Sequence, residues 1–185
     1  NDVRNMQGLL TNTFGWPQSC MRTLTDDNHG SMPTRRIIED AMRWLVAGAQ
    51  PGDVLFFHYS GHGAQQEDPE GVEEDGMNET ILPVDFEHCG MITDDQLGDY
   101  IVKPLPEGVR LTSVMDCCHS GTGLDLPFSW DLRRRAWREE TNPFHSLGDV
   151  LMFSGCEDDD TSSDASGNYG KPGGAMSTAF CDVLR

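Results

Sequence analysis

Two runs of apolar residues that end in small and reactive residues constrain the fold of this chain most. One run covers residues 53–63 and places His62 between Gly61 and Gly63, and the other covers residues 109–121 and carries adjacent cysteines near its end. A strand that is apolar on both faces is typical of a parallel sheet covered by helices. Ligands of such sheets bind at the carboxyl ends of the strands. We therefore expect the histidine and the cysteines to meet at one edge of a buried parallel sheet.

Helix and strand patterns alternate along the chain. Apolar spacing, cap residues and the capping-box pair Thr93 and Gln96 predict helices at residues 3–10, 33–48, 93–104 and 175–184. Apolar runs bounded by turn residues predict strands at residues 20–25, 53–59, 109–115 and 150–153. The charged residues 133–142 are expected to form a loop or tether. The alternation favours an α/β sandwich with a mostly parallel central sheet flanked by helices.

The length of the chain indicates the number of domains, and its net charge indicates which kinds of molecule it can bind. The chain has 185 residues, 37% of them hydrophobic, which suits one domain with one ordinary core. A formal net charge of -18 makes nucleic acids and anionic membranes poor partners and favours basic ligands or cations. Part of this charge lies in one segment punctuated by Gly and Pro, which we expect to be a solvated loop. Its acids are Glu67, Asp68, Glu70, Glu73, Glu74, Asp75 and Glu79.

Cysteine spacing and hydropathy indicate the setting. The six cysteines show no CxxC pair, so neither a disulfide framework nor a structural zinc site is indicated, and a reducing, cytoplasmic setting is expected. No apolar stretch reaches the roughly 20 residues that a membrane-spanning helix needs, and no signal sequence is visible. The chain opens on a helix cap, Asn1-Asp2, without the strand that should precede it. We therefore expect a chain that is truncated, at both ends.

A histidine and a cysteine at neighbouring strand ends are the parts of a thiolate nucleophile and its proton-transfer partner. Cys117 and Cys118 compete for the nucleophile's role, and since side chains alternate along a strand, only one of them can face His62. The residue pattern alone does not choose between them. A zinc site that uses the nearby His58 and His119 is conceivable, but adjacent cysteines lack the usual ligand spacing.

The two reactive segments, His-Tyr-Ser-Gly-His-Gly at 58–63 and Asp-Cys-Cys-His-Ser-Gly at 116–121, resemble those of metacaspases, the caspase-related cysteine peptidase family. The likeness covers nearly the whole chain, and the spacing is most similar to the type I group. Further matching segments lie at residues 81–85, 93–95, 109–112, 124–127, 153–155 and 174–177. The resemblance implies a single caspase-like domain with a large-subunit-like part, a connector and the start of a small-subunit-like part, at about 1–132, 133–148 and 149–185.

The resemblance also implies roles for individual residues. His62 would be the general acid and base, and Cys118, which directly precedes His-Ser-Gly, the nucleophile, which leaves Cys117 as a small buried hydrophobe. Main-chain N–H groups around Gly63 and Cys118 would stabilise the oxyanion. The family cleaves after Arg or Lys, and the matching acidic pocket consists of Asp116, Asp2 and Ser60. Asp2 can serve as a helix cap as well.

Calcium is the cofactor that the resemblance implies. The ligand positions correspond here to Asp94, Asp95, Asp125 and Asn78, the last in place of an acid, which lowers the expected affinity. Asp94 and Asp95 also suit the first turn of a helix without any metal. The expected protein is a monomeric, calcium-stimulated cysteine endopeptidase acting on basic peptides or proteins. The alternatives are a non-proteolytic scaffold of this fold that binds calcium or peptides, and a different Cys-His hydrolase.

Overall fold

The computed structural model describes residues 1–27, 30–69, 71, 76–118, 123–131, 133–140, 143–155 and 174–185. Its central sheet consists of β1 (Val54–Ser60), β5 (Arg110–Asp116) and β8 (Asp149–Ser154) in the order β1-β5-β8. Both pairings are parallel, with Ser60 opposite Asp116 and Met115 opposite Ser154. The parallel sheet predicted from the apolar runs is therefore confirmed, and its carboxyl ends share one edge.

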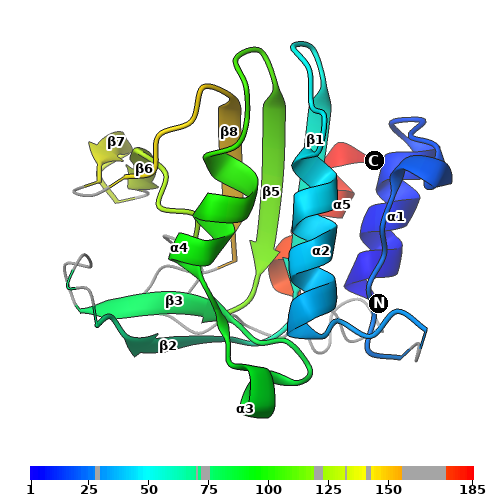
Figure 1. Cartoon of the computed structure of the whole chain (residues 1–185). Coiled ribbons are helices and arrows are strands. Elements are labelled where there is room, and N and C mark those ends of the chain that lie inside the picture. Colours follow the sequence, from blue (N-terminus) through cyan, green and yellow to red (C-terminus); the bar gives the residue numbers. More distant parts are fainter. Residues whose placement is uncertain are drawn as a thin grey trace.

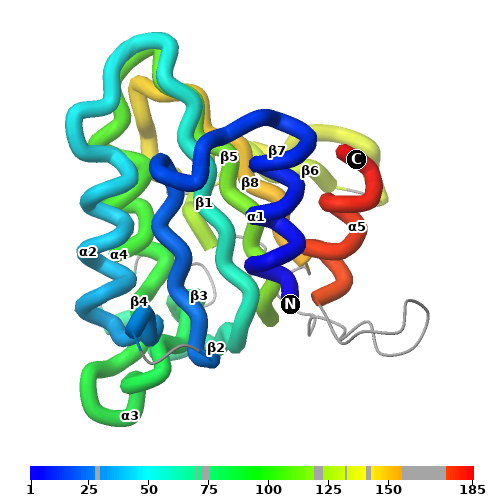
Figure 2. The backbone as a smooth tube through the Cα atoms, turned by 90° about the vertical axis from the view of Figure 1, so that its right-hand side faces the viewer, coloured from blue at the N-terminus to red at the C-terminus, as the bar shows by residue number. Residues whose placement is uncertain are grey.

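Helices cover both faces of this sheet. Helix α1 (Asp2–Asn12) and helix α5 (Ala175–Leu184) lie on one face, whereas α2 (Arg35–Val46) and α4 (Asp94–Leu97) lie on the other (Figure 2). A π-helical turn, η2 (Gly98–Val102), continues α4. Thr93 and Gln96 form the predicted capping box at the start of α4. The predicted helices and the α/β sandwich are thus confirmed.

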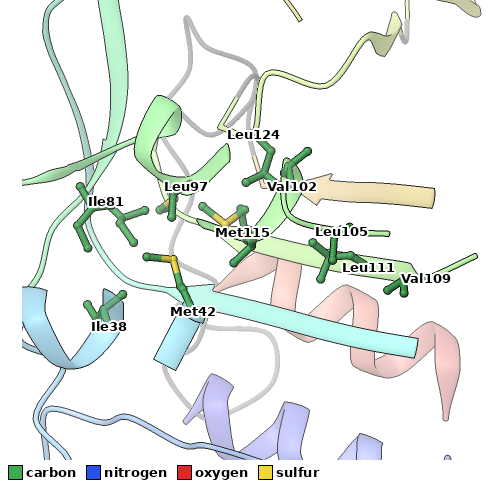
Figure 3. Packing of buried hydrophobic residues seen from close by; sticks show 13 residues of the cluster. Ile38, Met42, Ile81, Leu97, Val102, Leu105, Val109, Leu111, Met115 and Leu124 are labelled. Atoms are coloured by element: carbon green, nitrogen blue, oxygen red, sulfur yellow. The ribbon is translucent and has the colours of Figure 1, made fainter. Parts of the chain in front are cut away.

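The larger core cluster fills the space between α2, η2 and the sheet. Leu111 and Met115 of β5 pack there with Met42 of α2 and with Leu97 and Val102 (Figure 3). Val114, which points to the opposite face of the strand, packs instead with α1 and α5 in a smaller cluster. Strand β5 is consequently apolar on both faces, which is why its run of residues lacks hydrophobic alternation.

A second, antiparallel sheet runs across the carboxyl edge of the first (Figure 1). It consists of β2 (Gly63–Glu67), β3 (Met77–Ile81) and the two-residue β4 (Ile92–Thr93), and a short helix α3 (Phe86–Cys89) precedes β4. The prediction of a solvated acidic loop is wrong for Glu79, which lies in β3 and is 4% exposed. Glu70, Glu73, Glu74 and Asp75 lie outside the described residues.

Two further predictions of local structure are wrong. Residues 20–25 do not form a strand, because Gln18–Cys20 is a short 3₁₀ helix (η1) and residues 21–25 pair with no sheet. The charged connector is not a plain loop, because β6 (Phe128–Asp131) and β7 (Ala136–Glu139) pair there as an antiparallel hairpin. Its tryptophans, Trp130 and Trp137, stack edge to face on each other and remain exposed, which is why the hairpin adds nothing to the core.

Candidate active site

His62 and Cys118 each follow a strand of the central sheet by two residues. Because Ser60 of β1 lies opposite Asp116 of β5, the two chain segments leave the sheet side by side. Gly63 then passes so close to the second segment that a Cβ atom on it would lie 2.0 Å from the carbonyl oxygen of Cys118. Only glycine fits this approach. The structure therefore brings the predicted histidine and cysteine to neighbouring positions on one edge.

The main chain of His62 is held by Tyr59, a residue that the sequence analysis did not single out. The Tyr59 hydroxyl donates a hydrogen bond to the His62 carbonyl oxygen over 2.8 Å, and the Leu82 N–H donates to the same oxygen over 3.2 Å. Burial raises the pKa of the Tyr59 phenol above its ordinary value, so the hydroxyl stays protonated as a donor. Tyr59 could have been identified from the sequence, because it lies within the His-Tyr-Ser-Gly-His-Gly segment.

The adjacent cysteines lie in different surroundings. Cys117 is 2% exposed and belongs to the larger core cluster, whereas Cys118 is half-buried. Cys117 therefore has the packing expected of a small hydrophobe, and Cys118 is the more accessible thiol beside Gly63. His119, Ser120 and Gly121, which complete the motif, lie outside the described residues.

The three predicted pocket residues, Ser60, Asp116 and Asp2, lie at the carboxyl edge of the central sheet. The Ser60 hydroxyl donates to the Asp2 carboxylate over 3.0 Å, and the other Asp2 oxygen is buried with no hydrogen-bond partner among the described residues. Asp116 is 4% exposed and accepts a hydrogen bond from the main-chain N–H of Ser177 over 2.6 Å. Asn1 caps α1 without a side-chain hydrogen bond, so the predicted capping contact is absent there.

His58 lies between these acids. Its Nε2 atom and the Ser177 hydroxyl form a hydrogen bond of 2.9 Å. Burial lowers the pKa of His58 to about 4, although the nearby charges of Asp116 and Asp2 act in the opposite direction. His58 is consequently neutral at pH 7. No sequence pattern indicated the partnership with Ser177, because the two residues are 119 positions apart.

A second acidic group surrounds the start of α4. The buried Asp94 carboxylate accepts hydrogen bonds from the main-chain N–H of Glu79 over 2.7 Å and of Asp95 over 2.8 Å. Burial, the nearby charge of Asp125 and a hydrogen bond with the Glu79 side chain raise the pKa of Asp94 to about 9. Glu79 was missed as a member of this group, because the sequence suggested an exposed acid.

The oxygen atoms of this group have the chemistry that a hard cation prefers. The side-chain oxygen of Asn78, beside Glu79 in β3, is buried without a hydrogen-bond partner among the described residues. The buried Asp94 and the half-buried Asp125, which repel each other, and an unpaired amide oxygen are donors that suit Ca²⁺. In the described part of the chain, however, no three His, Cys, Asp or Glu side chains are arranged to hold a metal ion. The donor chemistry fits calcium, and the carboxylates need amide, main-chain or water oxygens to complete a site.

None of the helices within the described ranges is long and apolar enough to cross a membrane.

A solved structure of a protein from Geobacter sulfurreducens superposes with a TM-score of 0.68. The superposition covers 98% of this chain and 70% of that one, and the two are 24% identical, so the likeness is one of fold.

Sequence comparisons extend the likeness from fold to family. The sequence profile described as the metacaspase, peptidase C14 domain matches residues 1–127. The whole chain aligns with Metacaspase-1 of Plasmodium falciparum at 42% identity, covering 31% of that protein. It also aligns with Metacaspase-1 of Schizosaccharomyces pombe at 39% and of Mycosarcoma maydis at 41%, covering 55% and 57% of those proteins. The chain thus spans 31% to 57% of the length of these relatives, and it belongs to the metacaspase family.

Proposed function

We propose that this chain is the catalytic part of a cysteine endopeptidase that cleaves after Arg or Lys. The observation that carries the proposal is the close passage of Gly63 over the Cys118 carbonyl, which sets an exposed histidine beside the accessible one of two adjacent cysteines. Membership of a family of cysteine peptidases supports the same reaction.

In the proposed reaction, the Cys118 thiolate attacks the carbonyl carbon of the scissile peptide bond and forms a tetrahedral intermediate. Main-chain N–H groups around Gly63 and Cys118 are the candidate donors to its oxyanion. His62 protonates the leaving amine, and an acyl-enzyme thioester remains. His62 then takes a proton from water as the water attacks the thioester, and the Cys118 thiolate leaves, which restores the starting pair of thiolate and protonated histidine. The hydrogen bonds from Tyr59 and Leu82 to the His62 carbonyl keep the histidine in place during both steps.

The acids at the carboxyl edge of the central sheet support a preference for substrates with a basic side chain before the scissile bond. Asp116 and Asp2 bring two carboxylates into a largely buried region, and a guanidinium or ammonium group would offset their desolvation. The formal net charge of -18 favours basic peptides or proteins as substrates over nucleic acids. We propose that the protein acts on them as a monomer.

We further propose that calcium stimulates the reaction. Asp94, Asp95, Asp125 and Asn78 are the residues that would hold the ion, and Ca²⁺ would supply positive charge that lets the buried Asp94 and the half-buried Asp125 ionise together. Glu79, which shares a hydrogen bond with Asp94, also lines a small cavity together with Cys117. Ordering of this group by calcium would therefore also order the end of β5, where Cys118 follows Cys117.

The test is hydrolysis of short fluorogenic peptides that end in Arg, Lys or Asp, with calcium and with excess chelator. We expect cleavage after Arg and Lys, faster with calcium. Faster cleavage after Asp would refute the proposed specificity, and full activity in chelator would refute the role of calcium. A folded protein that cleaves none of the peptides under either condition would favour a non-proteolytic scaffold.

A further inference from the structure

Ser177, in the first turn of α5, contacts two residues of the central sheet. Its main-chain N–H donates to Asp116 Oδ2 over 2.6 Å, and its hydroxyl forms the 2.9 Å hydrogen bond with His58 Nε2. Ser177 is fully buried. One residue of α5 therefore joins the carboxylate at the end of β5 to the histidine of β1.

Gly174, which precedes the first residue of α5, packs against the same carboxylate. A Cβ atom at this position would lie 2.0 Å from Asp116 Oδ2 and 2.4 Å from its Cγ atom. The φ angle of Gly174 is -64°, an ordinary value, so glycine is needed here for space and not for its conformational freedom. The start of α5 is therefore fitted to the Asp116 side chain.

The first turn of α5 faces this carboxylate. The N-terminus of a helix carries partial positive charge, and α5 directs its first turn at Asp116. His58 is neutral at pH 7, so it fixes the Ser177 hydroxyl without adding a cation next to the acid. In the described part of the chain, the groups that act on His58 are Ser177, Asp116 and Asp2, and none of these three is basic.

We propose that Ser177, fixed by His58, and Gly174 are positioning residues for charge selectivity: together they hold the Asp116 carboxylate in the orientation that meets a basic substrate side chain. The proposal rests on the proposed function, because it takes Asp116 as the acid that recognises the substrate. It makes α5, which lies far along the chain from both catalytic residues, a determinant of specificity.

The experiment compares kcat/KM for two peptides that differ only in having Arg or its uncharged isostere citrulline before the scissile bond. In Ser177→Ala the main-chain donor remains but the contact with His58 is lost, and we expect the preference for Arg to fall about tenfold, chiefly through KM. His58→Leu should give a similar fall. Gly174→Ala, which displaces the carboxylate directly, should reduce the preference about 100-fold.

Two variants separate positioning from loss of fold. Ser177→Thr keeps the hydroxyl and should restore most of the preference for Arg. Phe180→Leu loosens α5 at its contacts with Phe56 and Phe153 without touching Asp116, so it should lower the thermal midpoint and leave the preference unchanged. Circular dichroism of every variant confirms that it is folded.

The outcomes distinguish this proposal from the proposed function. If the unmodified protein cleaves the citrulline peptide as well as the Arg peptide, the proposed specificity fails. If the unmodified protein prefers Arg and folded Ser177→Ala and His58→Leu keep that preference, the positioning role is refuted. An equal loss of preference in Phe180→Leu would likewise overturn it, since any loosening of α5 would then suffice.

Discussion

At the scale of single residues, the adjacent cysteines offer the sharpest test of the catalytic assignment. Cys118→Ala should abolish peptide hydrolysis, because it removes the accessible thiol beside Gly63. Cys117→Ala should keep a substantial part of the activity, because that side chain packs in the core. Steady-state hydrolysis of an Arg-ended peptide by both folded variants is the measurement. Loss confined to the Cys117 variant would reverse the assignment.

In the proposed specificity, Asp116 is the residue that recognises the charge of the substrate. Asp116→Asn keeps the size of the side chain but removes its charge, so an Arg substrate would face an uncompensated site. We expect kcat/KM for Arg peptides to weaken by about 2 to 4 kcal/mol, and for citrulline peptides by less. An equal loss for both peptides would point to a collapsed pocket, and no loss for Arg would remove Asp116 from substrate recognition.

His58 gives the protein a dependence on pH with a definite sign. Its pKa is about 4 in the folded state and near 6.5 in the unfolded chain, so the unfolded chain binds more protons between these values. Stability should therefore decline as the pH falls from about 6.5 to 4. Urea unfolding at several pH values should show a weaker decline across this window for His58→Gln. Parallel curves would mean that His58 titrates normally in the folded protein.

At the scale of elements, the sequence predicted the parts of the fold whose pattern is local. The apolar runs of β1 and β5, the capping box of α4 and the whole of α5 match the structure. Strands β2 and β3 escaped prediction because their residues, such as Gln65, Gln66 and Asn78, are polar, and their pairing depends on contacts across the carboxyl edge. Tertiary context overrides local strand propensity in such a hairpin.

The same limit explains which part of the candidate site could be predicted. His62 and Cys118 stand within recognisable motifs at strand ends. Ser177 and Glu79 carry no local signal, because each gains its importance from a partner that folding brings near it. Burial of a carboxylate inside an acidic segment, as at Glu79, is a property of the folded state alone.

Strand β3 carries Asn78, which is the residue that tests the proposed calcium dependence. Asn78→Asp adds a carboxylate next to Glu79, whose main-chain N–H donates to Asp94, and should shift the calcium dependence of activity to lower concentration by about tenfold, from a starting range near millimolar. Asp95→Ala should remove the response. Thermal midpoints with chelator and with calcium give a second readout, since the added buried charge should lower the midpoint only without the ion. An unmoved calcium midpoint in Asn78→Asp would mean that these acids do not bind calcium and that Asp94 and Asp95 serve only the first turn of α4.

At the scale of the whole molecule, the two ends of β5 in the parallel sheet have different expected roles, the first in stability and the second in the proposed selectivity. Leu111, at the start of β5, is fully buried in the larger cluster, far along the strand from Asp116. Leu111→Ala should reduce the free energy of unfolding by about 2 to 5 kcal/mol. Urea denaturation measures this loss, and the preference for Arg over citrulline should stay as it is. A changed preference would show that the core of the sheet transmits strain to the pocket.

The hydrogen bond between Asp116 and Ser177 joins residues 61 positions apart, and α5 is synthesised after β1 and β5 because it follows them in the chain. His62 and Cys118 therefore leave the ribosome well before the helix that positions the acid. Contacts between distant positions in the chain also form late in folding, because closing a long loop costs entropy before it brings any stabilisation. The order of residues along the chain thus delays a selective site until synthesis has reached α5 and the helix has docked.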